Sequence, residues 1–126
     1  MQILGIGIDT VEIARVALAV RRKRFLDHAY TRAEQEYFAG RNWNQSVVAG
    51  NFAAKEAVLK ALGIGLSGAG LSDIEVLRIQ SGAPFVNLYA RAMQRFELLG
   101  GKKVWVTISH DRWRAVAQAI VEGEAK

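Results

Sequence analysis

Three charged residues in two separate segments have the types and spacing to hold a metal ion beside a phosphate group. Asp9 ends an apolar run, Ile3–Asp9, which two glycines interrupt and which fits a buried strand. Glu56 and Lys60 lie four residues apart in a second segment, where one helical turn brings them together. Magnesium is usually bound by one or two carboxylates and by substrate phosphates. If the strand end meets the helix, Asp9 and Glu56 form a magnesium site, and Lys60 can neutralise a phosphate.

Each of these residues also has an ordinary structural interpretation, which local sequence alone favours. Asp9 fits a helix cap or a turn, and Glu56 and Lys60 fit a common surface ion pair. Lys55 falls inside the apolar arc of the same helix, where an ionised side chain is costly unless it is paired. Its ordinary interpretation is a side chain whose charged end reaches solvent. His110 directly follows a predicted strand, a position that is more often structural than catalytic.

The hydrophobic pattern predicts an α+β fold, with helices packed on a mostly antiparallel sheet, to position these residues. The 126 residues suit a single domain over 1–126. We expect strands over Ile3–Asp9, Ile74–Gln80, Phe85–Leu88, Val104–Ser109 and Trp113–Val121. We expect helices over Val11–Arg24 (capped by Thr10), from the capping box of Thr31 and Glu34 to Phe38, over Gln45–Leu62 and over Tyr89–Leu99, and a glycine-rich loop over 63–70.

Composition narrows the possible functions. The absence of Cys excludes disulfides, thiolate metal sites and Cys nucleophiles. No apolar run approaches the roughly 20 residues of a membrane span, and the N-terminus lacks the pattern of a signal peptide, so we expect a cytoplasmic protein. Lys and Arg number 17 against 12 Asp and Glu, for a net charge of +5. That excess leaves nucleic acid, an anionic membrane, a phosphate-rich small molecule or an acidic protein as possible partners.

Several common motifs are missing. No G-x-S-x-G pattern surrounds Ser109, and the glycine-rich loop lacks the G-K-[ST] ending of a P-loop. The basic run Arg21–Arg24, with Arg15 before it, indicates either a solvated face or a docking surface for an anionic partner. No aromatic residues alternate with these cations, so the run does not favour binding of single-stranded nucleic acid.

Three segments, in order, resemble the motifs of one enzyme family. They are Ile3–Ile13 (ILGIGIDTVEI), Phe52–Gly63 (FAAKEAVLKALG) and Ser109-His110 followed by Ala115–Ala119 (AVAQA). Together they are similar to the holo-acyl carrier protein synthases, the short bacterial type of the 4'-phosphopantetheinyl transferase superfamily. The resemblance covers essentially the whole chain.

The resemblance implies a magnesium-dependent enzyme. Such an enzyme transfers the 4'-phosphopantetheine group of coenzyme A to a serine of an acyl carrier protein, releases 3',5'-ADP and supports fatty acid biosynthesis. It also implies a homotrimer with active sites at subunit interfaces, and partners other than nucleic acid or membrane. Either a metal-oriented water or the carboxylate of Glu56 could accept the serine proton, and the sequence leaves both open.

Matching by motif gives individual residues their expected roles. We expect Asp9, Glu56 and Lys60 to be catalytic, Asp9 and Glu56 to bind Mg²⁺, Lys60, Ser109 and His110 to bind coenzyme A, and Arg15 and Arg22 to bind the acidic carrier protein. Asn51 stands where many relatives carry an Arg, which puts a phosphate contact there in doubt and makes Arg41 a candidate to replace it. Ile64 and Ala83 also depart from the common pattern.

Two other functions compete with this one. A non-enzymatic basic module would bind RNA or DNA with a steep salt dependence and no need for magnesium. An enzyme-like chain could instead have become a structural subunit, although the intact pair of Asp9 and Glu56 argues against this.

Overall fold

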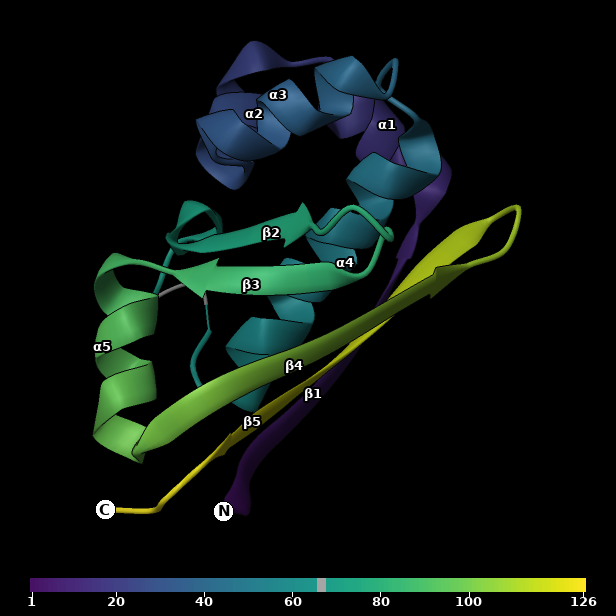
Figure 1. The fold of residues 1–126 in the computed structure, drawn as a ribbon. Helices are drawn as coiled ribbons and strands as arrows, with labels where there is room; N and C mark the ends of the chain where they lie inside the picture. The colour runs from purple at the N-terminus through teal and green to yellow at the C-terminus, as the bar shows by residue number, and fades with distance from the viewer. Residues whose placement is uncertain (66–67) are drawn as a thin grey trace.

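The computed structural model describes residues 1–65 and 68–126 and is shown in Figure 1. Its helices and strands follow one another as β1 (Gln2–Glu12), α1 (Ile13–Ala19), α2 (Lys23–Ala29), α3 (Arg32–Gly40), α4 (Gln45–Ala61), a 3-10 turn (Leu71–Asp73), β2 (Ile74–Arg78), β3 (Pro84–Leu88), α5 (Ala90–Leu99), β4 (Gly101–His110) and β5 (Arg114–Gly123). None of the helices in these ranges is long and apolar enough to cross a membrane. The predicted loop over 63–70 includes residues 66 and 67, which lie outside the described residues.

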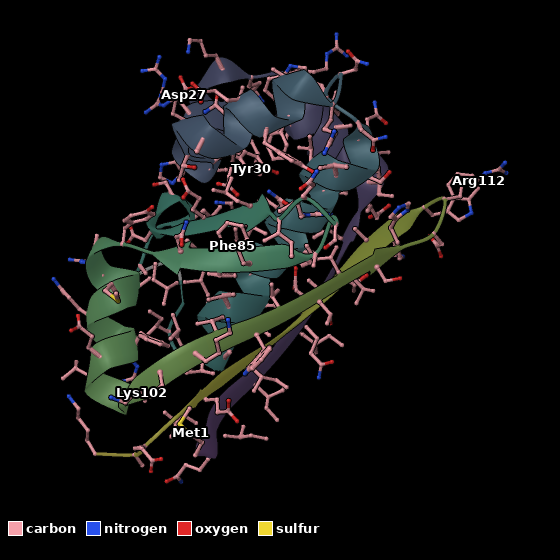
Figure 2. All side chains as sticks on the ribbon, viewed as in Figure 1. Met1, Asp27, Tyr30, Phe85, Lys102 and Arg112 are labelled. Carbon is pink, nitrogen blue, oxygen red and sulfur yellow. The ribbon has the colours of Figure 1, made fainter. Side chains whose placement is uncertain are left out.

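Two antiparallel sheets form the β part of the fold. The larger has the strand order β1-β5-β4, and the smaller is the β2–β3 hairpin. Helix α4 crosses the larger sheet, while α1, α2 and α3 gather above β2 in Figure 1. Tyr30, labelled in Figure 2, is buried between these helices and the rest of the fold, where its hydroxyl donates to the carbonyl oxygen of Val48 at 2.9 Å. The predicted α+β fold is confirmed.

Small residues let α4 approach the sheet closely. Gly5 and Gly7 of β1 face the helix, and a Cβ on Gly7 would overlap the carbonyl oxygen of Ala57. On the central strand β5, the helix-facing positions Ala115 and Ala117 are fully buried. Strand residues that point to one face alternate along the chain, so Asp9 lies on the same helix-facing side as Gly7. Close packing of β1 on α4 therefore carries Asp9 to the helix.

The predicted helix over Val11–Arg24 is wrong at both ends. Strand β1 continues through Thr10 to Glu12, with Thr10 opposite Val116 of β5, so Thr10 is a ladder residue and caps no helix. Helix α1 ends at Ala19, and α2 begins only at Lys23. Backbone pairing with a complete neighbouring strand outweighed the local helical pattern. The basic run Arg21–Arg24 consequently spans a break between two helices.

The charge of Lys55 lies inside the protein, so the prediction of a solvent-reaching side chain is wrong. Its side chain is 0% exposed, and its ammonium group donates to Glu34 Oε1 at 2.5 Å. It also donates to the carbonyl oxygens of Leu71 and Ile74. The capping box of Thr31 and Glu34 is confirmed, with Thr31 N donating to Glu34 Oε1 at 3.0 Å. Glu34 thus caps α3 and balances Lys55 at once.

Candidate active site

Strand β1 meets the last turns of α4 at Ile8 and Asp9, which brings Asp9 and Lys60 together. Lys60 Nζ donates to Asp9 Oδ1 at 3.1 Å and to the carbonyl oxygen of Ile8 at 2.9 Å. The predicted surface pair of Lys60 with Glu56 is not formed among the described residues, because the lysine turns to the strand instead. Lys60 remains exposed, whereas Asp9 is largely covered. The ammonium group of Lys60 therefore lies against the carboxylate of Asp9, which stands three residues before the end of β1, so the prediction that Asp9 ends the strand is wrong.

Glu56 completes a pair of carboxylates at this place. Partial burial raises the pKa of Glu56, and the negative charge of Asp9 raises it further, while Lys60 acts in the opposite direction. A carboxylate whose ionised form is disfavoured by burial and by a neighbouring negative charge makes a site that a cation stabilises. Their oxygen donors are also the type that Mg²⁺ prefers. The donor set fits a hard divalent ion that takes its other ligands from water or substrate, because the described residues hold no cluster of three or more His, Cys, Asp or Glu side chains.

Ser109 and His110 lie on the opposite edge of the same sheet. Asp9 belongs to β1, whereas both of these residues end β4, with β5 between the two strands. Since neighbouring strands are about 4.8 Å apart, β1 and β4 are separated by about 10 Å before the offset along the strands is added. His110 is exposed, with Nδ1 3.2 Å from the carbonyl oxygen of Asp111. One chain therefore does not bring these residues to Asp9.

The hairpin that carries His110 projects from the body of the protein. Figure 2 shows Arg112 at its tip, away from the helices. Asp111 stabilises the turn, since its Oδ1 accepts from the backbone N–H of both Trp113 and Arg114 at 2.8 Å. Those hydrogen bonds hold the pKa of Asp111 below its usual value. The ordered, exposed tip is suited to contact a neighbouring molecule.

The two arginines expected to contact a carrier protein are both exposed. Arg15 lies on α1 with only a 3.8 Å ion pair to Glu12, and Arg22 immediately precedes α2. A cavity of about 340 Å³ opens beside Arg15, with Phe25 and Phe52 among its walls. Thr10, the residue after Asp9, lines the same cavity. The surface next to Asp9 and along α1 therefore combines a basic side chain, Arg15, with an apolar cavity wall formed by Phe25 and Phe52.

Two residues that contact α4, Glu34 and Arg78, were not predicted from the sequence to have these contacts. Glu34 was assigned only a capping role, although the buried Lys55 requires an acidic partner. Arg78 was not singled out, yet its Nη2 donates to Asn51 Oδ1 at 3.2 Å. Arg41, the suggested replacement for an arginine at position 51, instead donates from Nε to the hydroxyl of Tyr37 at 3.2 Å.

Comparison with known proteins identifies close relatives over the whole chain. Residues 5–117 match the family model described as the 4'-phosphopantetheinyl transferase superfamily. A holo-[acyl-carrier-protein] synthase of Clostridium perfringens is 46% identical, with 97% of this chain and 96% of the relative aligned. Another, from Clostridium tetani, is 42% identical, with 97% of this chain and 98% of the relative aligned.

Solved structures with ligands also share the fold. The Helicobacter pylori holo-[acyl-carrier-protein] synthase in complex with coenzyme A has a TM-score of 0.80 and 32% identity, covering 93% of this chain and 99% of that one. A Plasmodium yoelii acyl carrier protein synthase with ADP bound has a TM-score of 0.86 and 31% identity, covering 98% and 97%.

Proposed function

We propose an active site for this chain on the basis of its family. Its full-length similarity shows that it belongs to the holo-[acyl-carrier-protein] synthases of the 4'-phosphopantetheinyl transferase superfamily. The reaction transfers the 4'-phosphopantetheine group of coenzyme A to a serine of an acyl carrier protein and releases 3',5'-ADP. The convergence of Asp9, Glu56 and Lys60 carries the assignment of the site. We place this activity in a single cytoplasmic domain, residues 1–126, that supports fatty acid biosynthesis.

Asp9 and Glu56 would hold Mg²⁺, because they supply two neighbouring carboxylates whose counter-ion, the ammonium group of Lys60, is exposed and can move aside. Bound there, the metal ion would supply positive charge to the phosphoryl oxygens. Lys60 leaves Asp9 and turns its ammonium group to the same pyrophosphate, which its exposed position permits. The protein's contribution is then largely charge neutralisation and positioning.

The chemical step forms one bond and breaks another at the same phosphorus. The serine oxygen attacks the β-phosphorus of coenzyme A, and the bond from that phosphorus to the bridging oxygen breaks, so that 3',5'-ADP leaves with the electron pair. The serine proton passes to Glu56 or to a water at the site.

A homotrimer with interfacial sites would unite the two sheet edges. Ile6, Ile8 and Trp105 lie on the sheet face away from α4 and are 57%, 59% and 54% exposed. Exposed apolar surface of this kind marks a protein–protein interface. A second copy of the chain would cover this face and would also bring its His110 close to Asp9 of the first copy. Ser109 and His110 of one protomer would then bind the coenzyme A held by its neighbour.

The acidic carrier protein would dock along α1. Arg15 lines the cavity next to Asp9 with only a 3.8 Å ion pair to Glu12, and Arg22 is exposed just before α2, so an acidic partner on this surface brings its serine to the carboxylate pair. Arg15→Glu with Arg22→Glu should raise KM for the carrier protein more than KM for coenzyme A. An equal rise in both values would mean that docking lies elsewhere.

Transfer itself is tested by incubating the protein with coenzyme A, Mg²⁺ and an apo carrier protein, and by mass spectrometry of the carrier. We expect the added mass of one phosphopantetheine group. Asp9→Asn and Glu56→Gln should abolish the addition and keep the circular dichroism spectrum. Glu36→Gln, on the exposed surface of α3, is the matched control and should retain full activity. Normal activity in either site variant would refute the metal assignment.

A further inference from the structure

The tip of the β4–β5 hairpin carries a large aromatic side chain that the fold leaves in solvent. Trp113 is 70% exposed, against 39% for Trp43 and 54% for Trp105. The guanidinium group of Arg112 lies over its ring, with Cζ 5.7 Å from the ring centroid. A side chain this exposed contributes little burial to the fold. Trp and Arg are also among the residue types that most often dominate the binding energy of protein–protein interfaces, so the pair has the composition of a binding surface.

The backbone beneath Trp113 is ordered by hydrogen bonds within the hairpin. Asp111 Oδ1 accepts from the backbone N–H groups of Trp113 and Arg114, both at 2.8 Å. The backbone N–H of Asp111 donates in turn to the carbonyl oxygen of Arg114 at 3.0 Å. A contact made by a segment that is already ordered costs less conformational entropy than one made by a loop that must be immobilised. The tip therefore presents Trp113 in a form suited to binding.

The same tip adjoins the surface on which the carrier protein is proposed to dock. The backbone N–H of Ile13, the first residue of α1, donates to the carbonyl oxygen of Trp113 at 2.9 Å. Arg114, the next residue, lies opposite Glu12 in the sheet and lines the same cavity as Arg15. Trp113 thus stands beside the first turn of α1, and the docking surface continues from Arg15 onto the hairpin.

The charge of the hairpin tip suits the same partner. Arg112 and Arg114 form no ion pair within the ranges 1–65 and 68–126. Asp111 is the acidic residue of the turn, and its Oδ1 is already bonded to backbone N–H groups. The tip is therefore basic, and an acidic protein that lies on α1 gains favourable electrostatic contact from the hairpin as well.

We propose that Trp113 and Arg112 form a second contact for the acidic carrier protein, beside α1, and that this contact helps to determine which carriers the enzyme accepts. This inference rests on the proposed function. The Trp113 ring packs on an apolar side chain of the carrier, and Arg112 pairs with a carboxylate next to it. A carrier with a basic residue at that place meets a like charge on Arg112, and specificity then arises from repulsion as well as attraction.

The test measures transfer kinetics over a range of apo carrier protein concentrations. Trp113→Ala should raise KM for the carrier about five- to thirtyfold, the effect of losing a residue that dominates an interface, and should leave KM for coenzyme A unchanged. Trp113→Phe keeps an aromatic ring and should recover most of this loss. Arg112→Glu should raise the same KM, and more at low salt than at high salt.

Leu98→Ala is the matched control. Leu98 is also 70% exposed, but it belongs to α5, which lies far from the hairpin tip in Figure 1. Its replacement should leave both KM values unchanged. An unchanged KM for the carrier in Trp113→Ala would overturn the proposal, as would an equal rise in KM for coenzyme A or a rise of the same size in Leu98→Ala.

Two further measurements separate this contact from its alternatives. A second copy of the chain is the other candidate occupant of the tip, so Trp113→Ala is also examined by sedimentation. An assembly that dissociates in this variant would make the tip a subunit contact and would refute docking of the carrier there. Calorimetry with the carrier protein alone measures docking without transfer. If Trp113→Ala weakens that binding while the wild-type protein transfers nothing, the proposed function fails and the docking contact stands.

Discussion

Replacing Lys55 with Met removes the charge that balances Glu34 inside the fold. Met has nearly the length of the lysine stem, so the variant keeps most of the packing and loses the ammonium group. Three acceptors lose the hydrogen bond that Lys55 donates, namely Glu34 Oε1 and the carbonyl oxygens of Leu71 and Ile74. The Glu34 carboxylate stays buried, with hydrogen bonds from Thr31 N, Val76 N and Asn51 Nδ2 and no cation.

The variant loses stability because the Glu34 carboxylate remains buried without a cation. Removing one partner of a buried ion pair destabilises a protein by about 3–5 kcal/mol. A chain of this length loses about 4 °C in melting temperature per kcal/mol, so we expect Tm to fall by roughly 12–20 °C. The paired change of Glu34→Gln with Lys55→Met should recover part of that loss, because no uncompensated charge remains buried.

Thermal unfolding followed by circular dichroism measures these shifts. Lys23→Met is the matched control, since Lys23 pairs with Asp27 at 2.7 Å on an exposed helix face. An exposed pair contributes at most about 1 kcal/mol, so this control should lose less than about 4 °C. If Lys55→Met lowers Tm no more than Lys23→Met does, the buried ion pair contributes no more stability than an exposed one.

The loss should also depend on pH. Burial raises the pKa of Glu34, and Lys55 opposes that effect, so the folded-state pKa rises further in the Met variant. A carboxyl group with a raised pKa is tolerated in its neutral form at low pH and becomes unfavourable as pH rises through its folded-state pKa. The difference in Tm between wild type and variant should therefore be larger at pH 7 than at pH 5. A difference that does not change with pH would contradict this account.

The remaining predictions concern assembly and close packing. Gly7→Ala should lower Tm and activity together, because a Cβ would overlap the carbonyl oxygen of Ala57 and push β1 from the helix. Gly40→Ala, with open space around its Cβ position, is its control and should do neither. Coexpressing Asp9→Ala with His110→Ala protomers should restore transfer that each lacks alone, and sedimentation should give a trimer. A monomer, or mixed protomers without activity, would refute the interfacial site.

The sequence was sufficient to predict the elements that depend on local patterns. The alternation of residue types along β4 and β5 predicted these strands, and the long apolar arc of α4 predicted the helix that packs on them. The residue types and the four-residue spacing of Glu56 and Lys60 are local properties, so these candidates could be chosen from the sequence. The expected meeting of the first strand with the helix occurs at Asp9, but three residues before the strand ends.

What the sequence could not supply depends on contacts between distant residues. The extension of β1 through Glu12 requires Arg114 opposite it, more than a hundred residues away. Lys55 could be identified as needing a partner, but only the packing of α3 on β2 determines that Glu34 provides it. The separation of His110 from Asp9 follows from the strand order, which no spacing in the chain reveals.

Gly5 and Gly7 have a consequence for genetic screens. Both contribute no side chain, yet a methyl group on either would overlap a backbone oxygen of α4. Random mutagenesis followed by selection for lost activity should therefore recover substitutions at these glycines as often as at Asp9 and Glu56. In such a screen, apparent catalytic positions would include residues that have no reactive atoms, and purified protein would be needed to tell the two kinds of allele apart.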